Sequence, residues 1–161
     1  MKDTGETRDS GRDEIFLYSD GACSPNPGLG GWGVVLVSPR HGAVRELSGA
    51  EPDTTNNRME LRGAIEGLRA LKRPCRVKVT TDSEYLKKAF TAGWLQKWQA
   101  NGWRTAGKKP VLNIDLWREL LAAMEPHEVT WAWVRGHADH PENTRADALA
   151  VAARKSLAQK Q

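Results

Sequence analysis

Three acidic residues lie where the sequence pattern predicts that strands end or a helix begins. Asp20 follows the alternating segment EIFLYS and precedes Gly21, and Asp82 follows RVKVTT. Glu60 lies in TTNNRMEL, which we interpret as the first turn of a helix. Each acid alone has a common structural role, since aspartate before glycine favours a turn and aspartate before serine favours a helix cap. Those separate roles do not explain why all three acids stand at positions that one sheet can bring together.

The predicted chain path brings these three carboxylates to one patch. Strands joined by a right-handed crossover can be neighbours in a sheet, and ligand sites gather beyond the carboxyl ends of such strands. Crowded carboxylates repel one another unless a cation offsets their charge. Ligands that are all oxygen, without cysteine or histidine, favour Mg²⁺ or Mn²⁺ over zinc. We therefore predict a divalent-cation site at Asp20, Glu60 and Asp82.

A fourth acid and two histidines lie near the C-terminus. Asp147 borders the apolar face of a helix that we predict over residues 141–157, although a solvated helix flank is the more common role of such a residue. His137 and His140 lie in the preceding loop. A loop histidine suits proton transfer near neutral pH, but an isolated one is more often only a surface residue. Asp147 and His137 are thus candidates that depend on the rest of the chain.

The helix start TTNNRMEL also has an ordinary explanation. Asn57 can serve as the N-cap, and Glu60 can reach back to it in a capping box. A glutamate in the first turn also interacts favourably with the helix dipole. Capping does not exclude a functional role, because a helix start is a rigid place for a side chain that contacts a ligand.

The elements that must position these residues form an α/β pattern. Alternating polarity predicts strands at 14–22, 31–39, 43–50, 76–83 and 128–134, with a Pro- and Gly-rich loop at 23–31. Helical spacing predicts helices at 57–71, from Ser83, after Gly93, from Asn113 or Asp115 to Met124, and at 141–157. Three strands followed by alternating helices and strands predict a mixed sheet with helices on its faces.

The bulk composition indicates one globular domain. Of 161 residues, 39% are hydrophobic and 27% are charged, which argues against a disordered chain. No apolar run approaches the ~20 residues of a membrane span, the N-terminus lacks a secretory signal, and two cysteines make neither a disulfide framework nor a zinc site. We expect a domain at 14–157 between a polar tail at 1–13 and a short tail at 158–161. We also expect a cytoplasmic monomer that needs no protein partner and no membrane.

One segment is strongly basic although the net charge is only +4. No Asp or Glu occurs between Tyr85 and Ile114, where the cations are Lys87, Lys88, Lys97, Arg104, Lys108 and Lys109. A block of one sign is typical of a surface that binds a polyanion such as nucleic acid, although a net charge of this size does not demand one.

Four segments, in this order, resemble type 1 ribonuclease H in its bacterial form: YSDGACSPNPGLGGWG, TTNNRMEL, TTDSEYL and WVRGHADHPENTRAD. The resemblance covers residues 14–155. It implies a ribonuclease H-like fold, with a five-stranded mixed sheet and helices on both faces. It also implies hydrolysis of the RNA strand of an RNA–DNA hybrid with Mg²⁺. In a two-metal site one ion activates the attacking water and the other stabilises the leaving 3′ oxygen, which leaves 5′-phosphate and 3′-hydroxyl ends.

The resemblance also implies roles for single residues. The metal ligands would be Asp20, Glu60, Asp82 and Asp147, and His137 would assist proton transfer or product release. Cys23, Asn26, Asn56 and Asn57 would contact the minor groove of the hybrid, and Thr55 would form part of a phosphate pocket. Glu60 would also meet a ribose 2′-hydroxyl, a group that the wide minor groove of an A-like duplex exposes.

Residues 94–109, WLQKWQANGWRTAGKK, resemble the basic protrusion of the family, which we call the handle. Its implied substrate contacts are Trp94, Lys97, Trp98, Arg104, Lys108 and Lys109. Packing of the tryptophans against Trp103 is an ordinary alternative for at least one of them. Gln99 and Ala100 stand where lysines are common in the family, so we expect weaker and less salt-dependent binding.

The sequence departs from the family pattern at two further positions, and two other functions are alternatives. Glu84 stands where the family often has glutamine, and Asp139, two residues after His137, stands where a small residue is common. The rivals are a hybrid-binding module without catalysis and a related nuclease such as a junction resolvase. The four carboxylates argue against the first rival. The NNRME segment and the handle argue against the second.

Overall fold

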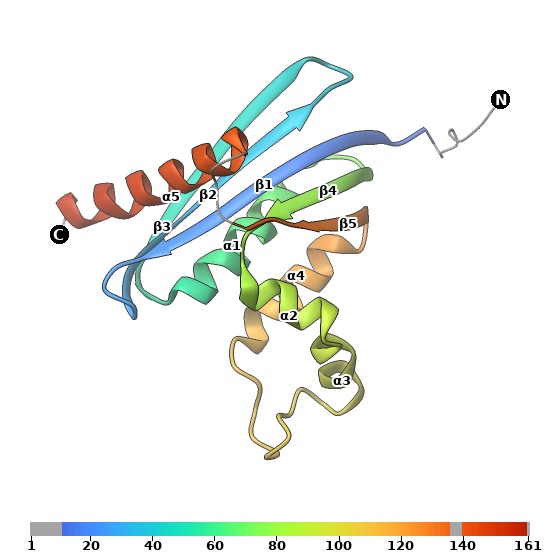
Figure 1. Cartoon of the computed structure of the whole chain (residues 1–161), viewed down its shortest axis with the longest axis vertical. Helices are drawn as coiled ribbons and strands as arrows, with labels where there is room; N and C mark the ends of the chain where they lie inside the picture. Colours follow the sequence, from blue (N-terminus) through green and yellow to red (C-terminus); the bar gives the residue numbers. More distant parts are fainter. Residues whose placement is uncertain (1–10, 136–139, 161) are drawn as a thin grey trace.

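The computed structural model describes residues 11–135 and 140–160. Its strands are β1 (Asp13–Cys23), β2 (Gly28–Ser38), β3 (Ala43–Thr54), β4 (Cys75–Thr81) and β5 (Glu128–Trp133). Its helices are α1 (Asn56–Arg69), α2 (Glu84–Thr91), α3 (Trp94–Ala100), α4 (Ile114–Met124) and α5 (Pro141–Lys160) (Figure 1). Within these ranges no helix is long and apolar enough to cross a membrane.

The strands form one mixed sheet in the order β3-β2-β1-β4-β5. β1 pairs antiparallel with β2, and β2 with β3. β4 lies parallel to β1 on one side and parallel to β5 on the other. The predicted five-stranded mixed sheet, with the first and fourth strands adjacent, is confirmed.

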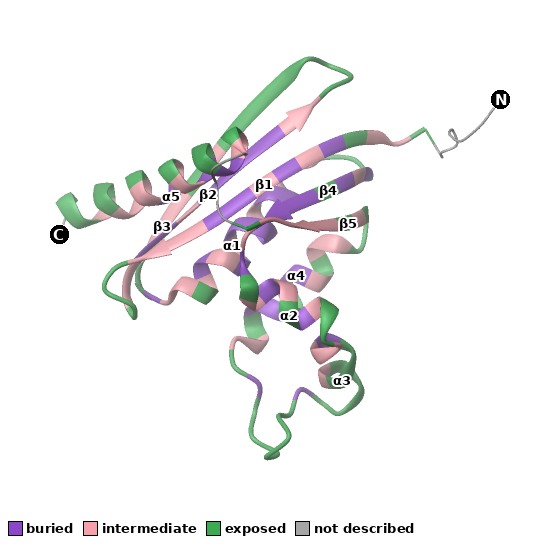
Figure 2. Cartoon of the chain, viewed as in Figure 1, coloured by how far each residue is buried: buried purple, intermediate pink, exposed green. Residues whose placement is uncertain are grey.

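Helices cover both faces of the sheet, but the two faces differ in side-chain size. On the face under α1 lies the larger core, in which Leu17, Val34 and Ile65 are fully buried. α5 covers the other face, where a Cβ at Gly31 would lie only 2.2 Å from the Ala150 carbonyl oxygen. Figure 2 shows buried residues concentrated in the central strands and in α1 and α4, whereas much of α5 is exposed. The glycines of β2 therefore let α5 approach the backbone of the sheet closely.

The first strand is longer than the sequence pattern predicts. The sequence predicts a strand at 14–22 that meets a turn at Asp20 and Gly21, but β1 runs through both residues to Cys23, because its pairing with β2 persists as far as the Cys23–Gly30 pair. The parallel pairing with β4 ends earlier, at Tyr18 and Thr80. Asp20 therefore lies where β1 has lost one neighbouring strand and keeps the other.

Other boundaries also differ from the prediction. The predicted loop at 23–31 is restricted to residues 24–27, since 28–31 pair with β3 and belong to β2. β3 extends to Thr54 for the same reason. α1 ends at Arg69 rather than Leu71, and α5 continues to Lys160 rather than Leu157. Pairing and packing with other elements, which local patterns do not encode, set these ends.

The half-buried His127, just before β5, is hydrogen-bonded to the first residue of β4 and carries a prediction about acid stability. The backbone N–H of Cys75 donates to Nδ1 of His127 at 3.1 Å. Burial lowers the pKa of His127, and a hydrogen bond to the Leu68 backbone opposes that shift. Because the folded-state pKa lies below the unfolded value of about 6.5, His127 stabilises the fold above that pH, and the stabilisation is lost as pH falls through the folded-state pKa.

We therefore expect the variant His127→Asn to lose less stability between pH 7 and pH 5 than the unchanged protein. Asparagine can still accept from Cys75 but does not titrate, so the difference is about 1 kcal/mol, the value of one lost hydrogen bond. Urea unfolding at both pH values measures it, with the exposed His41→Asn as the matched control. Equal pH dependence in the His127 variant and the unchanged protein would contradict this role.

Candidate active site

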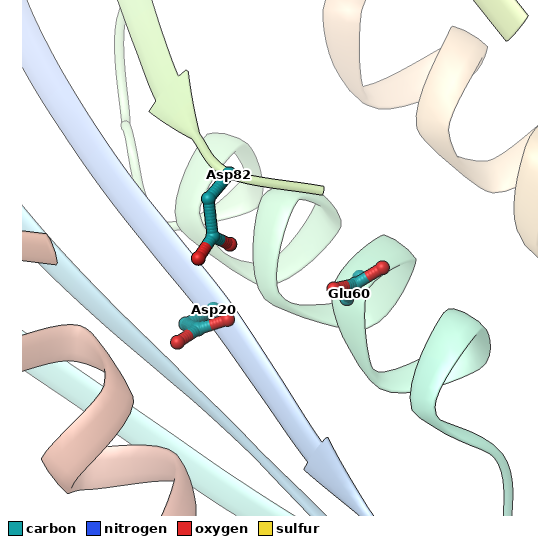
Figure 3. A group of neighbouring side chains, drawn as sticks. All are labelled: Asp20, Glu60 and Asp82. Carbon is teal, nitrogen blue, oxygen red and sulfur yellow. The ribbon is translucent and has the colours of Figure 1, made fainter. Parts of the chain in front are cut away.

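Three carboxylates from three elements converge at the point where β1 and β4 separate. Asp20 comes from β1, Glu60 from α1, and Asp82 directly follows β4 (Figure 3). Each offers a carboxylate oxygen, and these oxygens all lie within 4.8 Å of one another. The sheet thus assembles the three acids that are far apart in the sequence.

The electrostatics of the cluster disfavour its charged form. Burial raises the pKa of Asp20 to about 8, and the charge of Asp82 adds to the shift, while the Gly21 N–H donates to Asp20 Oδ1 at 2.9 Å and opposes it. Burial also raises the pKa of Glu60 to about 7, although the Ser83 hydroxyl donates to Glu60 Oε1 at 2.6 Å. Without a compensating cation, the cluster therefore holds protons near neutral pH.

The cluster fits a hard divalent cation. Its members are all carboxylates, and no cysteine or histidine joins the group in the part of the chain that the structure describes. Mg²⁺ and Mn²⁺ prefer oxygen ligands of this kind. A bound cation would also offset the repulsion that raises the pKa of Asp20 and Glu60.

Asp147 lies beside this cluster on α5. A hydrogen bond between Asp147 and Asp20 contributes to the raised pKa of Asp20. Asp147 does not belong to the group whose oxygens lie within 4.8 Å of one another. The buried Asn143 fixes the start of α5, because its Nδ2 donates to the Thr80 carbonyl oxygen at 3.3 Å. His137, the predicted proton-transfer residue, and Asp139 lie outside the described residues.

The start of α1 differs from the predicted capping box. The N-cap is Thr55, not Asn57, and its hydroxyl accepts from the Arg58 N–H at 3.1 Å. Thr55 has an extended backbone that continues directly from β3, so the helix begins earlier than predicted. Glu60 therefore lies beyond the first turn, and its carboxylate is hydrogen-bonded to the Ser83 hydroxyl and to the Asn56 side chain. Neither asparagine of the NN pair is needed as the cap.

The predicted groove residues lie at one place in the structure. The Asn56 backbone N–H donates to Asn26 Oδ1 at 3.1 Å, which joins the loop at 24–27 to the start of α1. The Cys23 thiol donates to the Thr54 carbonyl oxygen at 3.5 Å. Asn26 and Asn57 are exposed. The two segments that the sequence identified separately thus form one polar surface next to the carboxylates.

Two residues that the sequence analysis did not single out for the site hold it together. Ser83 was predicted only as a helix cap, yet its hydroxyl accepts from the Leu86 N–H and also donates to Glu60. Arg58 forms a bidentate ion pair with Asp115 at 2.9 and 2.7 Å and donates to Asn113 Oδ1 at 3.2 Å. The dipeptide Asp82-Ser83 at a strand end could have indicated the role of Ser83. No pattern in the sequence near Arg58 indicates that its partner is Asp115.

The handle projects away from the sheet (Figure 1). The ring of Trp98 lies 5.8 Å from Trp94, 6.3 Å from Trp103 and 5.8 Å from Trp117, so Trp98 packs the handle as the alternative interpretation expected. The handle cations are exposed at Lys97, Arg104, Lys108 and Lys109. A cavity of about 380 Å³ lies between α3 and the following loop, lined partly by Trp94, Lys97 and Arg104.

Comparisons with known proteins agree with this arrangement. The family model for RNase H matches residues 12–155. A ribonuclease H of Ralstonia nicotianae is 63% identical over 137 residues, which are 85% of this chain and 89% of that protein. One of Cupriavidus pinatubonensis is 58% identical over 90% of this chain and 98% of its own length.

Solved structures are also similar. LC9-RNase H1, described as a type 1 RNase H with the type 2 active-site motif, has a TM-score of 0.79 at 37% identity, over 90% of this chain and 74% of its own. LC11-RNase H1, solved in complex with an RNA/DNA hybrid, has a TM-score of 0.66 at 23% identity, over 89% of this chain and 98% of its own. The second likeness concerns the fold alone.

Proposed function

The chain belongs to the ribonuclease H family of nucleases, and on that premise we propose that it hydrolyses the RNA strand of RNA–DNA hybrids and leaves 5′-phosphate and 3′-hydroxyl ends. The observation that carries the proposal is the convergence of Asp20, Glu60 and Asp82 within 4.8 Å. Relatives named ribonuclease H, at 58–63% identity, support it.

The four acids would hold two divalent cations, with Mg²⁺ as the expected ion and Mn²⁺ as a possible substitute. When bound, the cations supply the Lewis acidity that activates water and stabilises the leaving oxygen. The protein orients the acids: the Ser83 hydroxyl holds Glu60, and the Gly21 N–H holds Asp20. His137 remains the predicted residue for proton transfer or product release.

The polar surface beside the acids would select RNA. Cys23, Asn26, Asn56 and Asn57 would face the minor groove of the hybrid, Thr55 would contribute to a phosphate pocket, and Glu60 would meet a 2′-hydroxyl. Side chains at this surface can read 2′-hydroxyls because the A-like minor groove is wide and shallow. The hydrogen bond between Asn56 and Asn26 supports this proposal, since it fixes the spacing of the two groove segments.

The proposal is tested by cleavage of a hybrid with a labelled RNA strand. We expect cutting with Mg²⁺, none with a chelator, and none of RNA–RNA or DNA–DNA duplexes of the same sequence. The products should be joined by a ligase without prior phosphorylation, and removal of their 5′-phosphate should abolish this ligation. Binding of the hybrid without cutting would support a module without catalysis, and cutting of a four-way DNA junction instead would support the resolvase alternative.

The handle carries a prediction about salt dependence. Gln99 and Ala100 are exposed on and at the end of α3, and replacing both with lysine adds two cations beside the proposed phosphate contacts. We expect a lower KM at low salt and a steeper dependence of log KM on log salt, by roughly 0.9 for each added contact. Steady-state cleavage between low and moderate salt measures the slope.

The matched control is the pair Ala43→Lys and Val44→Lys, which adds the same charge at exposed positions at the start of β3. We expect this pair to change the slope much less, because β3 begins at the end of the sheet away from Asp20 and its partner Gly33. The same slope in both pairs would show a general charge effect and would remove the specific role of the handle.

A further inference from the structure

An arginine of α5 has an unsatisfied, partly buried cation. Arg154 is half-buried, and its buried Nε atom has no hydrogen-bond partner in the part of the chain that the structure describes. No carboxylate of residues 11–135 or 140–160 lies within ion-pair distance of its guanidinium. A buried donor without a partner is unfavourable. The buried Nε atom cannot itself reach a ligand, but the terminal nitrogens of the guanidinium are not among the buried unpartnered atoms, so an external anion can bind there and balance the charge.

The position of Arg154 follows from the docking of α5 on β2. A Cβ at Gly31 would lie 2.9 Å from the Arg154 backbone nitrogen, so this turn of the helix rests directly on the strand. Gly31 pairs with Ala22, the neighbour of Cys23 in β1. Arg154 therefore lies over the end of β1 that bears the polar surface, not over the sheet centre.

Arg154 also shares a helix face with Asp147. Positions seven apart in an α-helix lie on nearly the same face, about 10 Å apart along the axis. The helix contacts Gly33, which pairs with Asp20, at Ala146, and contacts Gly31, which pairs with Ala22, at Ala150. α5 thus runs from the carboxylates toward Cys23. Asp147 lies near the carboxylates, and Arg154 lies nearer to Cys23.

The electrostatic effect of Arg154 reaches the polar surface. Burial raises the pKa of the Cys23 thiol, and the positive charge of Arg154 acts in the opposite direction. The guanidinium is therefore close enough to influence a residue that we assign to the substrate surface. A negative group bound there would lie within reach of it.

We propose that Arg154 binds a phosphate of the hybrid, as a contact beyond the groove residues and the handle. A guanidinium fits this ligand because its planar set of N–H donors matches the oxygens of a phosphate. The proposal rests on the proposed function, because it takes the bound polyanion to be the nuclease substrate. Arg154 would then bind the substrate on one side of the carboxylates, and the handle would bind it on the other side.

Arg154→Met removes the charge and keeps most of the aliphatic stem that packs on β2. The control is Lys155→Met, which removes the same charge from the exposed neighbouring position. Binding of a labelled hybrid is measured in chelator, where no cleavage can occur, and KM and kcat are measured with Mg²⁺. We expect Arg154→Met to weaken binding and raise KM about fivefold, to lower the salt slope by about one contact, roughly 0.9, and to leave kcat within about twofold.

Equal effects of the two variants, or no effect of Arg154→Met on binding, would overturn the proposal. If Arg154→Met does not fold, Arg154→Lys decides, because it keeps the charge but loses the planar guanidinium. Binding between that of the unchanged protein and that expected for Arg154→Met supports the proposal. Binding equal to that of the unchanged protein overturns the proposed guanidinium contact with a phosphate. The binding measurement in chelator separates the test of this phosphate contact from the test of the proposed nuclease function. A chain that binds the hybrid through Arg154 but never cuts it would refute the proposed function and leave the phosphate contact standing.

Discussion

We expect the variant Asp20→Asn to lose hybrid cleavage by roughly 10³-fold or more and, at the same time, to be more stable than the unchanged protein in chelator at pH 9. Activity falls because the variant lacks one carboxylate of the cation site. Stability rises because Asp20 is only 5% exposed and is surrounded by other acids. Loss of function and gain of stability in one variant distinguish a site acid from a structural one.

The sign of the stability effect follows from the raised pKa of Asp20, about 8 in the fold against about 3.9 in the unfolded chain. Between these values the folded protein holds a proton that the unfolded chain has lost, so its stability falls as pH rises. The difference between the variant and the unchanged protein should grow from near zero at pH 4 to about 5 kcal/mol at pH 9, at about 1.4 kcal/mol for each pH unit between the two pKa values.

Urea unfolding across this pH range, in chelator, measures the difference. Asp115→Asn is the matched control with the opposite sign, because its hydrogen bond to Arg58 lowers the pKa of Asp115, and the variant should lose stability at neutral pH. Added Mg²⁺ should stabilise the unchanged protein more than Asp20→Asn, since only the former keeps the full ligand set. A variant that is less stable at pH 9, or that keeps a tenth of the activity, would contradict the assignment.

The second large effect is expected at a glycine that touches no substrate. Gly33 pairs with Asp20 in the sheet, and a Cβ there would lie 2.2 Å from the Ala146 carbonyl oxygen and 2.8 Å from the Ala150 nitrogen. These are backbone atoms of α5, so the helix must move away to make room. We expect Gly33→Ala to destabilise the fold by about 3 kcal/mol.

The same variant should lower kcat at least tenfold, because α5 carries Asp147 next to Asp20, and a displacement of about 1 Å at a reacting site has large effects. Gly107→Ala is the matched control, since a Cβ there would meet only Thr105 Oγ1 at 3.9 Å. Unfolding and steady-state kinetics of both variants test the idea. A Gly33 variant as stable and active as the Gly107 variant would mean that the contact with α5 is not needed.

The order of elements and the identity of the acids could be predicted from the sequence. Period-two and helical patterns gave the five strands and the helices, because each element exposes one face to the core and the other to solvent. A strand, a helix and a parallel strand in succession also limit the possible sheet order. This reasoning predicted that the strands of Asp20 and Asp82 are neighbours, and the structure confirms that β1 and β4 are adjacent, although β4 ends at Thr81 and Asp82 directly follows it.

The ends of the elements could not be predicted in the same way. Asp-Gly is a turn signal, yet β1 passes through Asp20 and Gly21 because β2 remains paired to it. The helix start was placed at Asn57 because asparagine is a good cap, but Thr55 takes that position where β3 runs directly into α1. Local propensity and long-range pairing compete at such points, and only the assembled sheet decides between them.

By itself, the sequence determined which residue types are available for the chemistry and on which elements they lie. The tertiary structure decided how they meet: it brought three oxygens within 4.8 Å, raised the pKa of Asp20 and Glu60 by burying them, and paired Ser83 with Glu60. It also left the buried Nε atom of Arg154 without a hydrogen-bond partner among the described residues, with the guanidinium charge near enough to Cys23 to oppose the rise in the pKa of its thiol. Distances and burial depend on contacts between residues far apart in the chain, and no local pattern encodes those contacts.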